Sequence, residues 1–303
     1  MECTALKDLA LSIGCVCREN IPMRDYTSFA IGGPAELFIE AASPEALGSL
    51  AAACRQQEIP LFILGNGSNL LVSDDGIPGV VLHMGGGFDR VELEGEDTVV
   101  CGAGAKLSGV CAFALRHGLS GLEFAWGIPG SAGGAAYMNA GAYGSEMKNV
   151  LLSCAHVGRD GLPGSREGEA LDLSYRHSAY AASGEIITGL RLQLQPGDPA
   201  AIRERMDTLM QQRKSKQPLE YPSAGSVFKR PPGRFAGTLI EQCGLKGCQI
   251  GGAQVSEKHA GFIVNRGGAT CSDVRRLIAH IKETVFRQTG VELQTEIKLV
   301  GLL

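Results

Sequence analysis

A serine that could act as a proton donor lies in a segment of small residues. Ser226 follows Gly225, which leaves its hydroxyl uncrowded, and Lys229 comes three residues later. A serine is a weak acid, so it can give up a proton only where a nearby cation stabilises the alkoxide that it leaves. Lys229 or Arg176 could supply that charge. An ordinary Ser-Ala-Gly turn explains the same residues without any chemistry, so both interpretations stay open on this segment alone.

Three further polar residues could take part in chemistry, each with a plain structural alternative. Arg176 could bind a carboxylate through its planar guanidinium, or it could form a surface ion pair. Glu296 lies on the polar side of an alternating C-terminal segment, 291–299, where an outward carboxylate is ordinary. His259 follows Lys258 just before an apolar run, and it could project from a strand end or serve as a structural histidine.

Two glycine-rich loops could bind a phosphate-bearing ligand. The first, Gly65-Asn66-Gly67-Ser68-Asn69, directly follows the apolar residues 61–64, which predict a buried strand. Glycines let a backbone turn sharply and approach a ligand, and successive amides in such a turn form a concavity that suits a pyrophosphate. A tight connection without a ligand is the alternative for this loop.

The second loop covers residues 126–144, of which six are glycine. Such a segment would make a poor core, and it makes sense if a flat or bulky ligand lies against its backbone. Neither loop has the third glycine of a dinucleotide-binding turn, and the chain has no G-x-x-x-x-G-K-[ST], H-E-x-x-H or G-x-S-x-G motif. The sequence therefore argues against a Rossmann enzyme, a P-loop NTPase, a zincin and an α/β-hydrolase.

The composition narrows the class of protein further. With 303 residues the chain is long enough for two or three lobes, and a net charge of −4 argues against nucleic acid as a partner. No apolar run approaches the ~18 residues of a membrane span. The ten cysteines have no C-x-x-C spacing and the six histidines are scattered, which predicts thiols in a reducing cytoplasm and no metal site.

Short strands and helices alternate along the chain without a regular βαβ order, which predicts an α+β fold. We expect the apolar residues 9–17 to form the face of an N-terminal helix and Ser272 to cap a C-terminal one. The other expected helices cover 44–57, 106–117 and 200–213, and the other expected strands cover 79–84, 90–102 as a hairpin, 150–158 and 185–195. A polar loop is expected at 159–168 and a linker at 195–199.

Seven segments, taken in order, resemble the UDP-N-acetylenolpyruvoylglucosamine reductase (MurB) family across nearly the whole chain. They are Tyr26–Ala35, Leu64–Leu70, Gly127–Ala135, Tyr175–Ser178, Ser223–Lys229, Ile250–His259 and Thr295–Glu296. The resemblance implies a two-lobed FAD-binding domain of the vanillyl-alcohol-oxidase/PCMH type and a C-terminal α+β substrate-binding domain. We place the first domain at 1–197, with its lobes meeting near 85–90, and the second at 198–303.

The resemblance also implies the reaction. NADPH reduces a non-covalently bound FAD, and the enolpyruvyl ether of a UDP-sugar is then reduced to UDP-N-acetylmuramate for peptidoglycan synthesis. Ser226 would protonate the substrate, while Arg176 and a protonated Glu296 would stabilise the enolate-like charge. The enzyme is expected to be a cytoplasmic monomer with no nucleic-acid or membrane partner.

The resemblance assigns the two loops and several basic residues to ligands. The FAD contacts would be Gly65, Asn66, Gly67, Ser68, Asn69, Pro129, Gly130, Ser131, Gly133, Gly134 and Ala135. The UDP-sugar contacts would be Arg213, Lys216, Lys229, Arg230 and His259. Arg230 stands where the other subclass of the family commonly has Asn, and the short stretch between Arg176 and the strand at 185–195 resembles the shorter subclass, type II.

Two other functions remain open on the sequence. A related flavin oxidoreductase with another substrate would share the two loops, but it would have no reason to keep Ser226, His259 and Glu296 together. A flavin-binding module without turnover would bind FAD and leave NADPH unoxidised.

Overall fold

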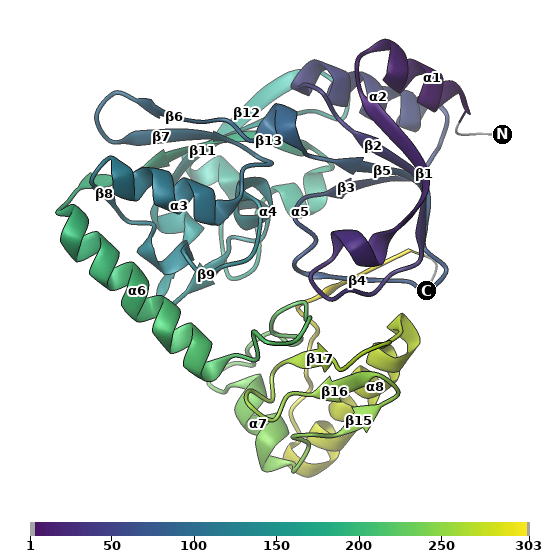
Figure 1. The fold of residues 1–303 in the computed structure, drawn as a ribbon, viewed down its shortest axis with the longest axis vertical. Coiled ribbons are helices and arrows are strands. Elements are labelled where there is room, and N and C mark those ends of the chain that lie inside the picture. Colours follow the sequence, from purple (N-terminus) through teal and green to yellow (C-terminus); the bar gives the residue numbers. More distant parts are fainter. Residues whose placement is uncertain (1–3, 302–303) are drawn as a thin grey trace. The chain divides into compact units, whose positions relative to one another are not determined.

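The computed structural model describes residues 4–301, which form two compact units (Figure 1). Unit 1 is built from three segments: the chain up to Glu19, Leu37–Asn66 and Gly79–Gln212. Unit 2 is built from the three others: Asn20–Glu36, Gly67–Pro78 and Arg213 onward. Each unit has its own buried apolar cluster. The two units group residues that lie close together in space, and each draws on three separate segments of the chain. They therefore do not test the expected domain boundary at 197/198, which stays a prediction.

Unit 1 contains six α-helices in its described part, of which the two short ones at 132–137 and 180–183 were not expected from the sequence. They are α1 (Thr4–Ser12), α2 (Pro44–Gln56), α3 (Leu107–Arg116), α4 (Ala132–Tyr137), α5 (Tyr180–Ser183) and α6 (Pro199–Lys216), which runs on into unit 2. The predicted start of α2 is confirmed, because the Ser43 hydroxyl accepts a hydrogen bond from the Ala46 amide at 3.2 Å. The predicted end of α3 is confirmed as well, since Gly118 follows it with φ +63°.

One sheet of four strands runs in the order β1-β2-β5-β3. Its strands are β1 (Val16–Pro22), β2 (Pro34–Glu40), β5 (Ile77–His83) and β3 (Leu61–Leu64). β3 pairs with β5 in parallel, with Leu61 opposite Val80. Val80, Val81 and Leu82 are all buried, as expected for a strand covered on both faces. β3 itself is buried only at Leu64, and residues 61–63 are half-buried, so the prediction of a buried strand is confirmed only at the carboxyl end, where the first glycine-rich loop begins.

The second sheet of unit 1 has five antiparallel strands in the order β12-β11-β13-β7-β6 (Figure 1). They are β12 (Pro163–Glu167), β11 (Leu151–Val157), β13 (Ile186–Gln193), β7 (Thr98–Gly102) and β6 (Val91–Glu94). The hairpin expected over 90–102 is confirmed as β6 and β7. Two small pairs complete the unit: β8 (Leu119–Ser120) with β14 (Gln195–Pro196), and β9 (Gly141–Ala142) with β10 (Ser145–Glu146).

Unit 2 combines a three-stranded antiparallel sheet with two helices. The sheet has the order β15-β16-β17, from β15 (Gln249–Ile250), β16 (Ala253–Val255) and β17 (Ile263–Asn265). The helices are α7 (Ala236–Gln242) and α8 (Cys271–Thr289), and a parallel pair joins β4 (Leu70–Val72) to β18 (Lys298–Val300). The predicted helical period is confirmed, because the apolar face of α8 is buried at Val274, Leu277, Ile278, Ile281 and Val285.

Four local predictions were wrong. The N-terminal helix ends at Ser12, and the chain enters β1 at Val16. The expected loop 159–168 contains β12, an edge strand exposed at four of five positions, so no apolar alternation marks it. The residue that caps α8 is Thr270 rather than Ser272. The expected C-terminal strand is regular only over β18, because segment 291–297 meets its neighbour through an isolated bridge between Phe228 and Thr295.

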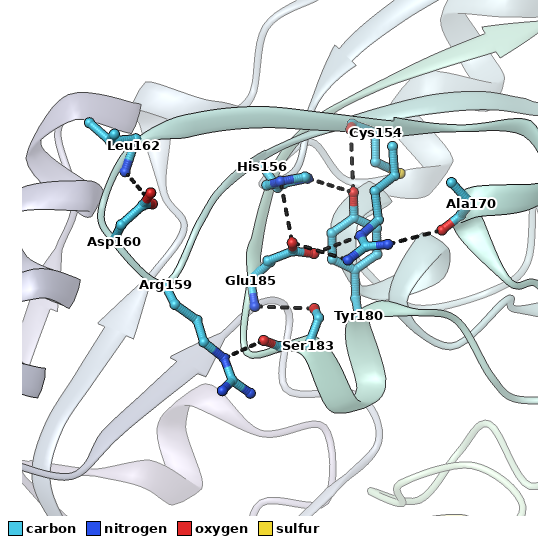
Figure 2. Close-up of polar contacts among 10 residues, drawn as sticks. Cys154, His156, Arg159, Asp160, Leu162, Ala170, Tyr180, Ser183 and Glu185 are labelled. Carbon is cyan, nitrogen blue, oxygen red and sulfur yellow. Dashed lines mark hydrogen bonds and ion pairs between the residues drawn. The ribbon is translucent and has the colours of Figure 1, made fainter.

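A polar cluster fixes the strands around α5 in unit 1 (Figure 2). The Tyr180 hydroxyl donates to the Cys154 carbonyl at 3.3 Å and lies 3.0 Å from His156 Nδ1. The Arg166 guanidinium binds Glu185 through two hydrogen bonds of 2.7 and 3.1 Å, which lower the pKa of Glu185. Burial raises the pKa of Tyr180. Neutral Tyr180 therefore anchors α5 to β11.

Among residues 4–301, no helix combines the length and the apolar character of a membrane span. The cysteines of this range are all thiols, and Cys54, Cys101, Cys111 and Cys154 are buried, as the apolar surroundings of each in the sequence predicted. Cys243, in a similar sequence context, is only half-buried.

Asp74 is a long-range cap on α8, and its removal provides a test of how unit 2 is stabilised. Its two carboxylate oxygens accept hydrogen bonds from the amides of Cys271 (2.8 Å) and Ser272 (3.0 Å), in addition to the capping box of Thr270 and Asp273. Asp74→Ala should lower the free energy of unfolding in urea by about 1–2 kcal/mol, because it leaves two helix amides without acceptors. Asp75→Ala, at the exposed neighbouring position, is the matched control. Equal effects of the two variants would contradict this role.

Candidate active site

Backbone hydrogen bonds hold the second glycine-rich segment flat against residues 103–107, within unit 1. The Leu107 amide donates to the Gly130 carbonyl (2.9 Å), the Ala132 amide to the Ala105 carbonyl (2.8 Å) and the Gly133 amide to the Ala103 carbonyl (2.8 Å). A Cβ on Gly133 would lie only 2.7 Å from the Cβ of Ala103. Glycine at 133 is therefore required by the close approach of two pieces of protein backbone.

Ser131 joins the two glycine-rich loops. It caps α4 by accepting a hydrogen bond from the Gly134 amide at 3.2 Å, and it is buried. A Cβ on Gly65, in the first loop, would lie 2.5 Å from the Ser131 hydroxyl oxygen. The structure thus brings together two loops that lie about sixty residues apart in the sequence, and a side chain at position 65 would force the Ser131 hydroxyl to move.

The two loops differ in what their amides can offer to a ligand. The amides of Ala132–Ala135 all donate hydrogen bonds within the protein, to Ala105, Ala103, the Ser131 hydroxyl and the Ser131 carbonyl. By contrast, none of the amides of Asn66–Asn69 donates to another residue within 4–301. Successive amides of this kind suit a pyrophosphate. The amides of the first loop therefore fit the pyrophosphate of FAD, while the expected contacts of the cofactor with either loop stay predictions.

The first loop also reaches the segment that carries Glu296, within unit 2. The Asn69 side-chain amide donates to the Glu296 carbonyl at 3.3 Å, and the Lys298 amide donates to the Asn69 carbonyl at 2.9 Å. On its other side, the Glu296 amide donates to the Val227 carbonyl at 2.7 Å. Glu296 is therefore fixed by its backbone between the first loop and the residue next to Ser226, and its side chain is half-buried.

Ser226 lies on an extended segment between two neighbours in unit 2. Isolated bridges join Ser226 to Phe262 and Phe228 to Thr295, and the Val227 amide donates to the Gly261 carbonyl at 2.9 Å. The Ser226 hydroxyl itself donates to the Phe228 carbonyl at 3.3 Å. Ser226 is half-buried, and its hydroxyl makes a single long hydrogen bond, so the O–H can turn towards another acceptor at little cost.

His259 lies close to Ser226, with Gly261 between them. A Cβ on Gly261 would lie 3.0 Å from the His259 ring and 3.4 Å from the Ser226 hydroxyl oxygen. The Gly261 amide donates to His259 Nδ1 at 3.1 Å, which requires the neutral tautomer with its proton on Nε2. Burial lowers the pKa of His259, which agrees with a neutral ring. His259 can therefore offer a neutral N–H donor beside Ser226.

Arg176 lies in a tight turn of unit 1. Ser174 and His177 exchange backbone hydrogen bonds of 3.2 and 3.1 Å, and Arg176 adopts φ +56°, which a residue with a side chain seldom does. The guanidinium stacks on the Tyr175 ring, 5.0 Å from its centroid, and donates to the Gly141 carbonyl at 3.5 Å. Residues that are held in an unfavourable left-handed backbone conformation, as Arg176 is, cluster at functional sites.

The remaining basic residues are placed as follows. Arg213 and Lys216 lie in the last turn of α6, where basic side chains favour the negative end of the helix. The backbone of Lys229 pairs with Gln294, and Arg230 stacks on the exposed ring of Phe235 at 4.5 Å. Their proposed contacts with a nucleotide stay predictions. Among residues 4–301, no group of three potential metal-binding side chains comes together.

Sequence reasoning missed two buried residues in unit 1, Asn139 and Ser178, both 0% exposed. Asn139 donates to the Ser174 carbonyl and Ser178 donates to the Tyr137 carbonyl. The available signal was a single amide-bearing residue within the glycine- and alanine-rich segment 126–144, which has no place in a purely apolar packing surface.

Comparisons with known proteins give matches over most of the chain. Residues 217–300 match the family model described as UDP-N-acetylenolpyruvoylglucosamine reductase, C-terminal domain, and residues 35–162 match the FAD binding domain model. The reductase of Clostridium novyi is 49% identical over 284 residues, covering 94% of this chain and 92% of the relative. That of Caldanaerobacter subterraneus is 49% identical over 282 residues, covering 93% of each.

Solved structures give the same result. The crystal structure of UDP-N-acetylenolpyruvylglucosamine reductase from Thermus caldophilus superposes with a TM-score of 0.82 at 38% identity, covering 94% of this chain and 100% of that one. A berberine bridge enzyme variant is similar with a TM-score of 0.50 at 16% identity, over 64% of this chain and 44% of that one. The second likeness concerns the fold alone. The expected FAD-binding domain of the PCMH type is thereby confirmed.

The contact between Gly65 and Ser131 provides a test of the flavin-binding loops. Gly65→Ala should weaken FAD binding to the apoprotein by about tenfold or more, because the new methyl group overlaps the Ser131 hydroxyl and displaces the cap of α4. Gly86→Ala is the control, since a Cβ there would meet no atom within 4 Å. Quenching of flavin fluorescence on titration measures both affinities. Unchanged affinity in the Gly65 variant would show that the two loops need not meet in this way.

Proposed function

Because the chain belongs to the UDP-N-acetylenolpyruvoylglucosamine reductase (MurB) family, we propose that it reduces UDP-N-acetyl-3-O-(1-carboxyvinyl)-glucosamine to UDP-N-acetylmuramate, a step of peptidoglycan synthesis. The observation that carries the proposal is the meeting of three motifs in unit 2. Asn69 of the first loop bonds the backbone of Glu296, and Glu296 bonds Val227 next to Ser226. A flavin-contacting loop and two groups able to handle protons are thus connected directly.

FAD is the cofactor that this chain is built to hold, through the amides of Asn66–Asn69 and the flat segment 129–135. When bound, FAD carries two electrons from NADPH to the terminal carbon of the substrate's vinyl group. NADPH as the donor is part of the proposal. The chain's own task is then to bind the substrate carboxylate, to stabilise the charge that develops on it and to supply one proton.

Arg176 and Glu296 are proposed to stabilise that charge. As electrons reach the vinyl group, negative charge develops towards the substrate carboxylate, and donors fixed in advance lower the barrier most effectively. Arg176 can bind a carboxylate with two hydrogen bonds, and its backbone is held in a tight turn. Glu296 is proposed to donate a hydrogen bond to the same charge, a role that only a carboxylic acid can fill.

Ser226 is proposed to give its proton to the substrate carbon that bears the carboxylate. Its hydroxyl makes one long hydrogen bond to the Phe228 carbonyl, which costs little to break. The neutral His259 lies on the far side of Gly261 and can donate from Nε2. Lys229 supplies positive charge three residues along the same segment, which favours the alkoxide left on Ser226.

Arg213, Lys216, Lys229, Arg230 and His259 are proposed to bind the UDP-sugar. A pyrophosphate carries charge that planar guanidinium groups and flexible ammonium groups bind well. We further propose that the enzyme works as a monomer, because every proposed site residue belongs to one chain. A cytoplasmic location follows from the proposed nucleotide substrates, which are cytoplasmic.

The role of Ser226 predicts a separation of the two half-reactions. Ser226→Ala should leave the reduction of bound FAD by NADPH within about twofold of the parent rate. It should slow reoxidation by the enolpyruvyl sugar by roughly 10²–10⁴-fold, the usual size of a general-acid contribution. Stopped-flow absorbance of the flavin under anaerobic conditions measures both rates, with Ser272→Ala on the exposed surface of α8 as control. Equal slowing of both half-reactions would remove Ser226 from the chemistry.

A further inference from the structure

Buried Asn139 connects the glycine-rich segment to the turn that carries Arg176. It is 0% exposed, and it adopts φ +41°, a left-handed conformation that asparagine tolerates better than most residues. Its side-chain oxygen accepts a hydrogen bond from the Lys148 amide at 2.9 Å, and its side-chain nitrogen donates to the Ser174 carbonyl at 2.9 Å. Both ends of the carboxamide are therefore used by backbone groups from two different segments.

The Ser174 carbonyl oxygen accepts two hydrogen bonds. One comes from Asn139, and the other comes from the His177 amide and closes the Arg176 turn. At the other end of the turn, the Ser178 hydroxyl donates to the Tyr137 carbonyl at 2.8 Å. Arg176 itself donates to the Gly141 carbonyl. The short segment 137–141 thus contacts the turn at its start, at its arginine and at its end.

Further contacts hold the loop 171–179, which contains this turn, and the residue that follows it. The Ala179 amide donates to the Leu171 carbonyl at 2.9 Å, and His177 Nε2 lies 2.9 Å from an Asp172 carboxylate oxygen. Directly after it, Tyr180 anchors α5 to Cys154 and His156 (Figure 2). These contacts fix the loop as a whole, whereas Asn139 fixes the turn against the glycine-rich segment.

We propose that Asn139 is a positioning residue for Arg176: its carboxamide holds the Ser174–His177 turn in register with segment 126–144, and so fixes where the guanidinium meets the substrate carboxylate. This inference rests on the proposed function for its consequence in catalysis. Its structural content, that Asn139 stabilises the turn, stands independently. A displacement of about 1 Å in a charge-stabilising group can cost roughly 10²-fold in rate.

Two substitutions at position 139 test the inference. Asn139→Asp keeps an oxygen for the Lys148 amide but loses the donor to Ser174. Asn139→Gly removes both hydrogen bonds, adds no buried charge and accepts the left-handed backbone, so it keeps the test valid if the aspartate variant fails to fold. The matched controls are Asn149→Asp and Asn149→Gly, because Asn149 lies ten residues further along the chain and, within 4–301, its side-chain oxygen accepts from Ser145 and Glu146 instead of the Arg176 turn.

The first readout needs neither FAD nor substrate turnover. Amide hydrogen exchange, followed by mass spectrometry, should show uptake in peptides covering 171–179 faster by roughly fivefold to tenfold in both Asn139 variants, as expected for one lost hydrogen bond. The Asn149 variants should match the parent protein there. Unchanged exchange over 171–179 in the Asn139 variants would overturn the inference, whatever the enzyme's substrate proves to be.

The second readout is a double-mutant cycle on flavin reoxidation by the enolpyruvyl sugar. Asn139→Gly should slow this step by roughly 10–100-fold in the parent and change it less than about twofold in an Arg176→Ala background, because it acts through Arg176. Independent, multiplying effects, or equal slowing of flavin reduction by NADPH, would contradict the positioning role. If the parent protein itself is not reoxidised by the sugar, the proposed function has failed, and the exchange result still decides the role of Asn139.

Discussion

The candidate site in unit 2 depends on the backbone hydrogen bonds that hold Glu296. The Asn69 side chain reaches its carbonyl, and its own amide reaches the carbonyl of Val227. The three residues come from parts of the chain about 160 and 70 residues apart, so no local preference could place them together. Contacts of its own backbone therefore place Glu296 next to the residue that adjoins Ser226.

Unit 1 uses the same principle for its glycine-rich segment. Three backbone hydrogen bonds hold Gly130–Gly133 against Ala103–Leu107, and Ser131 then meets Gly65, where a side chain would force the Ser131 hydroxyl to move. From this fixed base the chain continues through α4 to Asn139, which holds the Arg176 turn. Rigid backbone contacts are a sound support for a site whose chemistry is mainly electrostatic, because preorganised groups need not rearrange as charge develops.

Part of the fold could be predicted because those elements have strong local signals. Ser43 and Pro44 start α2, Gly118 ends α3, and the apolar period of α8 is regular. The failures concern elements set by contacts with distant residues. β12 is an exposed edge strand without alternation, and α8 starts earlier than expected because Thr270 and Asp74 both bind its first amides.

The candidate site was predictable in its parts rather than in its assembly. Residue types marked Ser226, Arg176 and the two loops as possible sites, but each had an ordinary alternative, and only seven segments taken in order resembled one family. Asn139 was missed since a buried carboxamide has no periodic signature. The glycines of the second loop were expected to face a ligand, yet Gly133 is required by Ala103, a contact that only the folded structure reveals.

The most direct test of the central claim is an anaerobic absorbance titration of the purified protein with FAD bound, first with NADPH and then with the UDP-enolpyruvyl sugar. The flavin band should bleach on adding NADPH and return on adding the sugar. A band that bleaches but does not return with the sugar would contradict the proposed substrate. A protein that cannot take up FAD at all would contradict the account from the first loop onward.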